Sequence, residues 1–297
     1  MLIWCIVLKK KIYTYLQLIR LPNIFSSLAD SSAGYLVVAD SIDIPVLICL
    51  SLVSACIYAA GCVLNDYCDI EKDQRERPER PIPSGRASKS EALFLFCTLS
   101  IVSLILSAYA GIRTFFTAFI LVMMVIVYSR ITKERPVAGP VNMALCRAVN
   151  LFLGMTAVAH VSILGLFFVL ISFLYVLSLT VLSDYEMTGT PGKKIWFVSS
   201  GLTGVLCILI FMGITQFIKK DSLLYTLIFI IFIGPPFIRM LKNIKPAAIG
   251  QAIKYLVLGI PVLDAVYVAG VQNWIYAVPV AACALVSIIA AKFFYVT

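Results

Sequence analysis

Long apolar blocks alternate with short polar intervals along the whole chain. Each block holds about the 20 residues that an α-helix needs to cross the hydrocarbon core of a bilayer. The blocks fall at residues 22–39, 45–64, 91–110, 114–130, 140–159, 163–182, 195–217, 222–240, 252–270 and 274–293. The pattern predicts an all-α, polytopic transmembrane bundle of nine to ten spans. Because the blocks leave no room for a soluble domain, we expect a single domain over residues 1–297.

Composition excludes an ordinary soluble protein. The 297 residues are 61% hydrophobic and 13% charged, whereas soluble domains are about half apolar and a quarter charged. The nine cysteines are scattered through apolar blocks, which favours neither a disulfide framework nor a zinc site. The opening MLIWCIVLKKK is too short to span a membrane and has no basic lead-in, so it predicts no signal peptide.

The basic residues predict the orientation in the membrane. Most of the 24 Lys and Arg residues lie on one side of the predicted spans, and only Arg113, Lys219 and Lys220 lie on the other, with Arg147 inside a span. The positive-inside rule assigns the basic side and the N-terminus to the cytoplasm. We therefore expect a multi-pass protein of a bacterial-type inner membrane. The net charge of +9 follows this rule, so it does not predict nucleic-acid binding.

The longest polar interval runs from Leu64 to Ser88 on the cytoplasmic side. It begins with five carboxylates within eleven residues, Asp66, Asp69, Glu71, Asp73 and Glu76, and continues into the proline-rich, basic segment RPERPIPSGR. If the preceding helix continues, Asp66, Asp69 and Asp73 share one face. Such carboxylates repel one another unless a cation lies among them, and Mg²⁺ that also contacts substrate phosphates suits them. The alternative is a solvated acidic loop between two spans.

A second polar interval, LSDYEMTGTPGKK at residues 182–194, lies on the same side. Asp184 and Glu186 come first, and the pair Lys193 and Lys194 closes it. The two cytoplasmic loops of interest are therefore 65–90 and 183–194, each acidic first and then basic.

Polar residues inside the spans are costly in hydrocarbon and commonly face a cavity. Asn23, Ser27 and Asp30 follow one another at helical spacing in the first span, as do Arg147, Asn150 and Gly154 in the fifth. Arg147 stays charged and needs an anion. Its partner is either a carboxylate within the bundle or a substrate phosphate.

Two late features complete the pattern. Asp264 and Tyr267 form a weaker polar pair, which we interpret as structural. The tripeptide Gly234-Pro235-Pro236 predicts a break or kink in the eighth span, giving a cavity an irregular wall.

The acidic interval resembles a known family signature. The run Asn65-Asp66-x-x-Asp69-x-x-x-Asp73, followed by Arg77-Pro78-x-Arg80-Pro81 and Pro83-Ser84-Gly85-Arg86, is similar to the first motif of the UbiA family of intramembrane prenyltransferases. The lead-in Arg20-Leu21-Pro22-Asn23 matches too, and the likeness covers about residues 16–270. Within the family, the stretch from Tyr128 to Gly154 and the ending with Lys254 and Asp264 look most like the EboC-type subgroup.

The resemblance implies an all-helical bundle around a central, lipid-accessible cavity, with two acidic motifs that bind prenyl diphosphate through Mg²⁺ at its cytoplasmic mouth. The implied metal ligands are Asn65, Asp66, Asp69 and Asp73 from the first motif and Asp184, with Glu186, from the second. Arg80 is the implied cation beside the diphosphate. The second motif departs from the family, because Thr188 and Thr190 stand where further carboxylates are usual.

We assign roles to these residues as hypotheses. Catalytic residues are Asp66, Asp69, Arg80 and Asp184; substrate-binding residues are Asn23, Arg80, Arg147, Asn150, Tyr185, Lys193 and Lys194. Mg²⁺ and the cations offset charge on the leaving diphosphate, and aromatic rings such as those of Tyr67, Tyr128 or Tyr185 stabilise an allylic cation.

The leading hypothesis is an Mg²⁺-dependent transferase that moves a prenyl group from a prenyl diphosphate to a lipophilic or aromatic acceptor. The alternative is a UbiA-like membrane protein of reduced or no turnover that handles or helps export a small precursor. An unrelated secondary transporter is least favoured, because it needs ionisable groups near the bilayer midplane, and most carboxylates here lie at the boundary.

Overall fold

The computed structural model describes residues 2–186, 192 and 194–294, and within them it is helical without β-strands. The helices in chain order are α1 (Leu2–Leu18), α2 (Leu21–Val38), α3 (Ile44–Cys68), α4 (Ile70–Glu76), α5 (Lys89–Ala110), α6 (Ile112–Val127), the π-helical turn η1 (Tyr128–Thr132), α7 (Ala138–Met155), α8 (Ile163–Ser183), α9 (Lys194–Ile214), α10 (Asp221–Lys242), α11 (Pro246–Leu258), α12 (Ile260–Val271) and α13 (Trp274–Ala290).

The apolar blocks of the sequence correspond to these helices. In the described part of the chain, seven helices are long and apolar enough to cross a membrane, counting α6 with η1 and α11 with α12 as one each. The predicted spans outside these seven are α2, α7 and α13. Helices α2 and α7 carry Asp30 and Arg147 in their interiors, and α13 has 17 residues. The all-α membrane bundle is thus confirmed.

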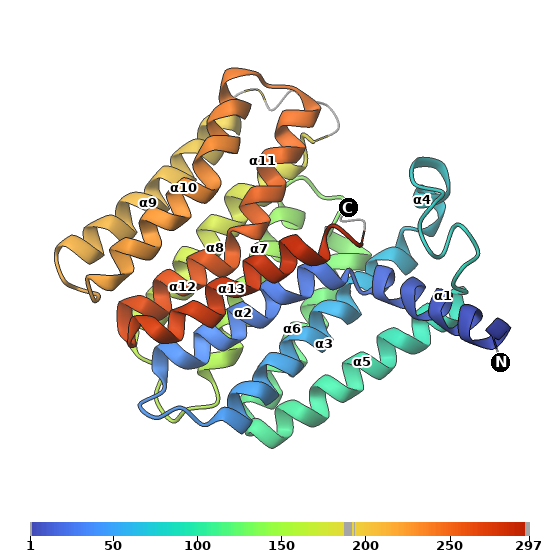
Figure 1. The fold of residues 1–297 in the computed structure, drawn as a ribbon, viewed down its shortest axis with the longest axis horizontal. Coiled ribbons are helices and arrows are strands. Elements are labelled where there is room, and N and C mark those ends of the chain that lie inside the picture. The colour runs from blue at the N-terminus through green and yellow to red at the C-terminus, as the bar shows by residue number, and fades with distance from the viewer. Residues whose placement is uncertain (1, 187–191, 193, 295–297) are drawn as a thin grey trace.

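The long helices run side by side in one bundle (Figure 1). Helices α9 and α10 form one flank, α3, α5 and α6 form the other, and α2, α7, α8, α12 and α13 lie between them. Helix α4 and the loop after it project beyond the ends of the long helices, on the side where α1 and the N-terminus lie. The acidic interval therefore lies at one end of the bundle.

Local signals fix several helix starts. Asp43, Ser162 and Asn273 each accept a hydrogen bond from a backbone N–H in the first turn of α3, α8 and α13. Ser88 and Glu91 form a reciprocal capping box at the start of α5. Each cap stabilises its helix by about 1 kcal/mol.

Two glycines bring α2 and α7 into close contact. A Cβ atom on Gly154 would lie 1.9 Å from the carbonyl oxygen of Ser31, and one on Gly34 would lie 1.9 Å from that of Leu151. No side chain fits at either position. Small residues allow helix backbones in membranes to approach closely, and this approach brings the polar residues of α2 against those of α7.

The helix irregularity that the sequence predicted in the eighth apolar block, residues 222–240, is found in another part of the chain. The sequence predicted a break or a kink in that block. Helix α10 runs unbroken through Pro235 and Pro236, so the break was wrong and the kink stays a prediction. The chain instead interrupts its helix at Gly259, between α11 and α12, with Pro261 in the first turn of α12. Proline lacks an N–H and is well tolerated in a first turn. Around this break, Phe168 of α8 stacks on Tyr267 of α12 at a centroid distance of 4.6 Å.

Candidate active site

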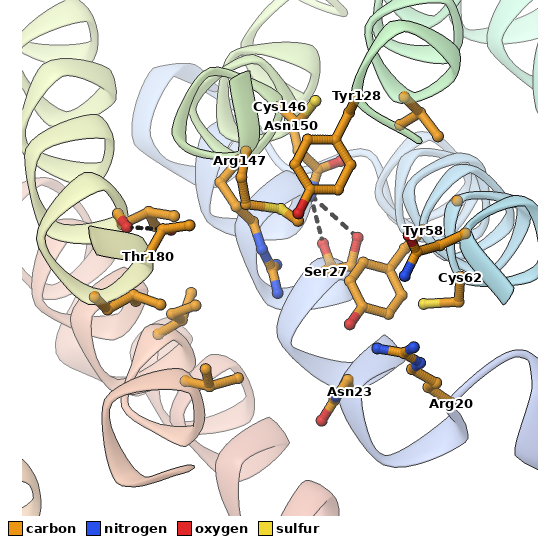
Figure 2. Close-up of a pocket in the computed structure, with 18 of the residues that line it drawn as sticks. Arg20, Asn23, Ser27, Tyr58, Cys62, Tyr128, Cys146, Arg147, Asn150 and Thr180 are labelled. Carbon is orange, nitrogen blue, oxygen red and sulfur yellow. Dashed lines mark hydrogen bonds between the residues drawn. The ribbon is translucent and has the colours of Figure 1, made fainter. Parts of the chain in front are cut away.

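A cavity of about 360 Å³ lies between the helices, within the size range of small-molecule sites. Its wall is mostly apolar and is built from α2, α3, α6, η1, α7, α8, α11 and α12. Figure 2 shows most of its labelled polar residues on one part of the wall, with Thr180 on the opposite part. The lining residues are Arg20, Asn23, Ser27, Ile57, Tyr58, Gly61, Cys62, Asn65, Leu121, Val125, Tyr128, Ser129, Met143, Cys146, Arg147, Asn150, Val176, Leu179, Thr180, Ser183, Glu186, Ile253, Val257 and Ile260.

Arg147 crosses from α7 to α2 at the cavity wall. Its Nη1 donates to Oδ2 of Asp30 at 2.6 Å, and its Nη2 donates to the hydroxyl of Ser26 at 2.6 Å. Its guanidinium also lies 5.2 Å from the ring centre of Tyr58, which is within cation–π range. Of the two partners that the sequence left open for Arg147, the structure contains the carboxylate.

Asn150, one helical turn further along α7, holds the same junction. Its Nδ2 donates to Oδ2 of Asp30 at 3.0 Å and to the backbone oxygen of Ser27 at 3.1 Å. Its Oδ1 accepts from the hydroxyl of Ser54 at 2.8 Å, joining α3 to the network. Figure 2 shows Asn150 meeting Ser27, while the guanidinium of Arg147 extends beside Ser27 on the side that faces Thr180. These hydrogen bonds satisfy buried polar atoms of Asn150, Ser27 and Ser54 and one carboxylate oxygen of Asp30.

The first acidic segment lies at the mouth of the cavity and is bound by arginines. Asp66, at the end of α3, accepts from Nη2 of Arg20 at 2.9 Å and from Nη1 of Arg80 at 3.3 Å. The same Nη1 of Arg80 donates to Asp73 at 2.8 Å. Arg80 and both carboxylates are buried. The proline-rich segment after α4 therefore folds back so that its arginine bridges two of the predicted ligands.

Arg20 reaches Asp66 from an unusual backbone conformation. Its φ of 50° and ψ of 55° are left-handed, and it directly precedes α2. For a residue other than glycine this conformation costs about 1–2 kcal/mol. The conformation turns the chain between α1 and α2 and directs the guanidinium into the mouth of the cavity (Figure 2).

Asp69 departs from the shared face that the sequence predicted. It is the residue at which α3 ends and α4 begins, with φ of −92° and ψ of 7°. Its carboxylate accepts from Nζ of Lys133, which also donates to Oδ1 of Asn65 at 2.6 Å. The prediction of one acidic face required an uninterrupted helix. The helix is interrupted at Asp69, and Asp69 pairs with Lys133, whereas Asp66 and Asp73 share Arg80.

The π-helical turn η1 positions Lys133 for this contact. The N–H of Lys133 donates to the carbonyl of Tyr128, five residues earlier, at 3.0 Å. Five residues span about 140° around an α-helix, but a π turn nearly superimposes them. Tyr128 therefore faces the cavity while Lys133, directly beyond it, reaches Asn65 and Asp69.

The donor set suits magnesium. Among the described residues, no group of three His, Cys, Asp or Glu side chains is arranged to hold a metal ion. Mg²⁺ binds through one or two carboxylates together with substrate phosphates and water. The carboxylate of Asp69 and the amide oxygen of Asn65 lie together at Lys133, and both are hard oxygen donors of the kind Mg²⁺ prefers. The residues present thus fit an ion that binds together with a phosphorylated ligand.

The second acidic segment begins where α8 ends. Asp184 follows the last residue of α8, and its partial loss of hydration raises the pKa of its carboxyl, while the charge of Lys194 lowers it. Lys194 lies 5.3 Å from the ring centre of Tyr185. Glu186 lines the cavity. Lys193, Thr188 and Thr190 lie outside the described residues.

The two acidic segments meet at the same mouth. Asn65 of the first and Glu186 of the second both line the cavity. Tyr128 lies within electrostatic range of Asp69 and Asp184. The structure thus brings together segments that are more than a hundred residues apart in the chain. Asn23, Arg147 and Asn150 line the cavity as well, whereas Tyr185 and Lys194 lie beside it.

Sequence reasoning left Arg20 and Lys133 out of the site. Arg20 stood within the family-like lead-in, and Lys133 follows a span on the basic side, so both carried a weak signal. Tyr58, Cys62 and Cys146 also line the cavity. Nothing in the sequence distinguishes these three from other residues of apolar helices.

Comparison with known proteins agrees with this architecture. A model of the UbiA prenyltransferase family matches residues 28–252. The chain is 32% identical over 207 residues to a digeranylgeranylglyceryl phosphate synthase from Sulfolobus acidocaldarius, covering 65% of this chain and 74% of that protein. A protein of the same name from Sulfurisphaera tokodaii is 32% identical over 141 residues, covering 47% of this chain and only 51% of the relative.

Solved structures share the fold. A structure of digeranylgeranylglyceryl phosphate synthase has a TM-score of 0.66 at 22% identity, covering 88% of this chain and 98% of that one. A UbiA homologue from Archaeoglobus fulgidus, bound to GPP and Mg²⁺, has a TM-score of 0.58 at 17% identity, covering 91% and 99%. With its membrane-length helices and its family match, the chain is an integral membrane protein. It belongs to the UbiA prenyltransferase family.

Proposed function

We propose that this protein is an Mg²⁺-dependent intramembrane prenyltransferase that moves a prenyl group from a prenyl diphosphate to a lipophilic or aromatic acceptor. The observation that carries the proposal is the mostly apolar cavity whose lining includes Asn65 of the first acidic segment and Glu186 of the second. A prenyl diphosphate has the matching shape, a polyanionic head on an apolar tail. The named function of the relatives and the GPP and Mg²⁺ bound to the A. fulgidus homologue support it.

The metal ligands are proposed on chemistry and position. Asn65, Asp66, Asp69 and Asp73 would hold magnesium from the first segment, and Asp184 and Glu186 from the second. When bound, Mg²⁺ supplies positive charge that stabilises the leaving diphosphate. Lys133 and Arg80 now neutralise Asp69, Asp66 and Asp73. We propose that Arg80 and Lys133 would contact the phosphate oxygens of the bound ligand, and that Asp66, Asp69, Arg80 and Asp184 are the catalytic residues.

The reaction breaks the bond between the allylic carbon and the diphosphate oxygen, and the electron pair leaves with the diphosphate. In our proposal Arg20, Arg80 and Lys133, which bind the carboxylates of the first acidic segment, stabilise this developing charge. Preorganised cations of this kind typically contribute about 3–4 kcal/mol each. Lys193 and Lys194 extend the basic rim in our proposal. The acceptor then bonds to the allylic carbon and loses a proton.

The cavity wall protects and orients the allylic group. The rings of Tyr58 and Tyr128 face the cavity next to its mouth (Figure 2). Such faces stabilise a carbocation by about 1–2 kcal/mol when desolvated. Tyr185, which the sequence offered for the same role, lies beside Lys194 instead. Asn23 and Asn150 are proposed to contact substrate from the wall, and the apolar remainder excludes water that would capture the cation.

Transfer is favoured over handling or export of a precursor. The curated relatives are named as synthases or transferases, and the donor atoms of the first segment are grouped with three cations at the cavity mouth. We further propose that this mouth faces the cytoplasm, because the basic residues of the chain concentrate at this end.

The test is turnover by purified protein in lipid nanodiscs. Radiolabelled farnesyl or geranylgeranyl diphosphate is supplied with Mg²⁺ and a series of lipid and aromatic acceptors, and diphosphate release and prenylated product are measured. We expect product with at least one acceptor, and its loss in Asp66→Asn.

The matched control is Asp40→Asn, which changes an exposed carboxylate in the loop between α2 and α3, at the opposite end of α2. This variant should turn over at the wild-type rate. Correctly folded protein that releases no diphosphate from any donor, while still binding prenyl diphosphates, would support the handling role instead.

A further inference from the structure

A second group of ionisable residues lies inside the bundle, away from the acidic mouth. Asp30 of α2 and Asp264 of α12 are 0% and 1% exposed. Both carboxylate oxygens of Asp264, Oδ1 of Asp30 and the hydroxyl of Tyr267 have no hydrogen-bond partner. Buried polar atoms without partners are rare because losing their hydration is costly. Four such atoms lie at this junction, which indicates that some of them share a proton or an ion.

The two carboxyl groups meet each other. Asp264 lies within hydrogen-bonding reach of Asp30, and Arg147 is the cation beside them. Two carboxylate oxygens cannot form a hydrogen bond unless one carries a proton. Without that proton the two groups would repel each other in a medium of low dielectric constant.

The charge balance points the same way. Two ionised carboxylates against the single guanidinium of Arg147 leave one excess negative charge in the middle of the bundle. Other titratable groups facing the pair are neutral in their ordinary state and supply no cation. They are Tyr267 on α12, Tyr175 on α8 and Cys283 on α13, with Tyr58 on α3 beside Arg147. One added positive charge makes the junction neutral.

We propose that Asp30 and Asp264 share one proton, so that with Arg147 they form a buried, charge-neutral triad joining α2, α12 and α7. The proton sits on Asp264 and is donated to Oδ1 of Asp30, while Oδ2 of Asp30 accepts from Arg147 and Asn150. This arrangement gives partners to the orphaned Oδ1 of Asp30 and to one oxygen of Asp264. A proton fits better than a metal ion, because among the described residues no group of three His, Cys, Asp or Glu side chains is arranged to hold a metal.

The triad has a consequence for the cavity. Arg147 lines the cavity, yet its charge is balanced by Asp30 and Asp264 rather than by a ligand. The inner wall therefore presents no net charge, which suits the uncharged part of an amphipathic ligand. Asp30 and Asp264 act as positioning residues that fix the direction of the Arg147 guanidinium.

The test is infrared spectroscopy of the full chain in nanodiscs, where the C=O stretch of a protonated carboxylic acid is separate from the carboxylate bands. We expect the wild-type protein to show this band, shifted in D₂O, with equal intensity from pH 6 to pH 8. Asp264→Asn and Asp30→Asn should each remove it, because the remaining carboxylate then pairs with Arg147. Asp40→Asn, in an exposed loop, should leave it unchanged.

Stability provides a second readout. The amide of Asp264→Asn can donate the hydrogen bond that the shared proton donates, so its melting temperature should match the wild type. Asp264→Leu, of similar volume, should melt lower because Oδ1 of Asp30 then stays unpaired. Absence of the wild-type band, or its persistence in Asp264→Asn, would overturn the proposal. If the band were missing and the melting temperature rose with Na⁺ concentration, the junction would hold a bound cation in place of the proton, and the proposal would also be overturned.

Discussion

Lys133 and Asp69 form an ion pair that links the π-helical turn after α6 to the end of α3. The same ammonium donates to Asn65. A single lysine thus neutralises one proposed metal ligand and contacts another. In our account it moves to the diphosphate when magnesium and substrate arrive.

Replacing Lys133 with methionine should weaken substrate binding while it frees Asp69. Hydrogen bonds to charged groups contribute about 1.5–3 kcal/mol, so we expect KM for prenyl diphosphate to rise about 10-fold to 100-fold. The apparent affinity for Mg²⁺ should rise at the same time, because the carboxylate loses its competing cation. Steady-state kinetics over a Mg²⁺ series measures both. Lys89→Met, an exposed lysine at the start of α5, should change neither.

Gly154→Val should separate α2 from α7. The added Cβ would start 1.9 Å from the carbonyl oxygen of Ser31, and overpacking of this kind costs about 1–3 kcal/mol or more. Thermal unfolding in detergent should show a lower melting temperature, together with reduced turnover because Arg147 and Asn150 lose their partners on α2. On Gly204 of α9 a Cβ would meet nothing within 4 Å. Gly204→Ala should therefore hold or raise the melting temperature, since alanine favours helix by about 1 kcal/mol over glycine.

Cys146 offers a direct probe of the cavity. It lines the wall beside Tyr128 (Figure 2), whereas Cys207 of α9 is exposed and is not among the lining residues. Geranylgeranyl diphosphate with Mg²⁺ should slow alkylation of Cys146 by a membrane-permeant maleimide and leave Cys207 unaffected, as read by peptide mass spectrometry. Equal labelling of Cys146 with and without ligand would place the prenyl chain outside this cavity.

The sequence predicted the fold well, because membrane spans are local in the chain. Every apolar block became helical, although the block at residues 252–270 is divided between α11 and α12. The polar residues Asn23, Arg147 and Asn150 line the cavity. The first acidic segment was also found from local spacing. Its geometry was only partly predicted, because the helix ends at Asp69 and the prolines that follow return Arg80 to Asp66.

The sequence did not predict which side chains pair across long distances in the chain. Asp66 meets Arg20 from 46 residues away, and Asp69 meets Lys133 from 64. Asp264 meets Asp30 from the far end of the chain. Such pairings depend on how helices pack, which no periodicity encodes. The sequence predicted an irregularity at Pro235 and Pro236, but the helix is interrupted at Gly259 instead. This outcome also depends on packing, since neighbouring helices decide whether a proline interrupts a span.

The central claim is that a divalent ion at the mouth of the cavity holds the diphosphate. Equilibrium binding of radiolabelled geranylgeranyl diphosphate to the protein in nanodiscs tests it most directly, with Mg²⁺ and after chelation. Our account predicts saturable binding that weakens strongly when magnesium is removed and is weak in Asp66→Asn under both conditions. Binding of equal affinity with and without magnesium in the wild-type protein would contradict it.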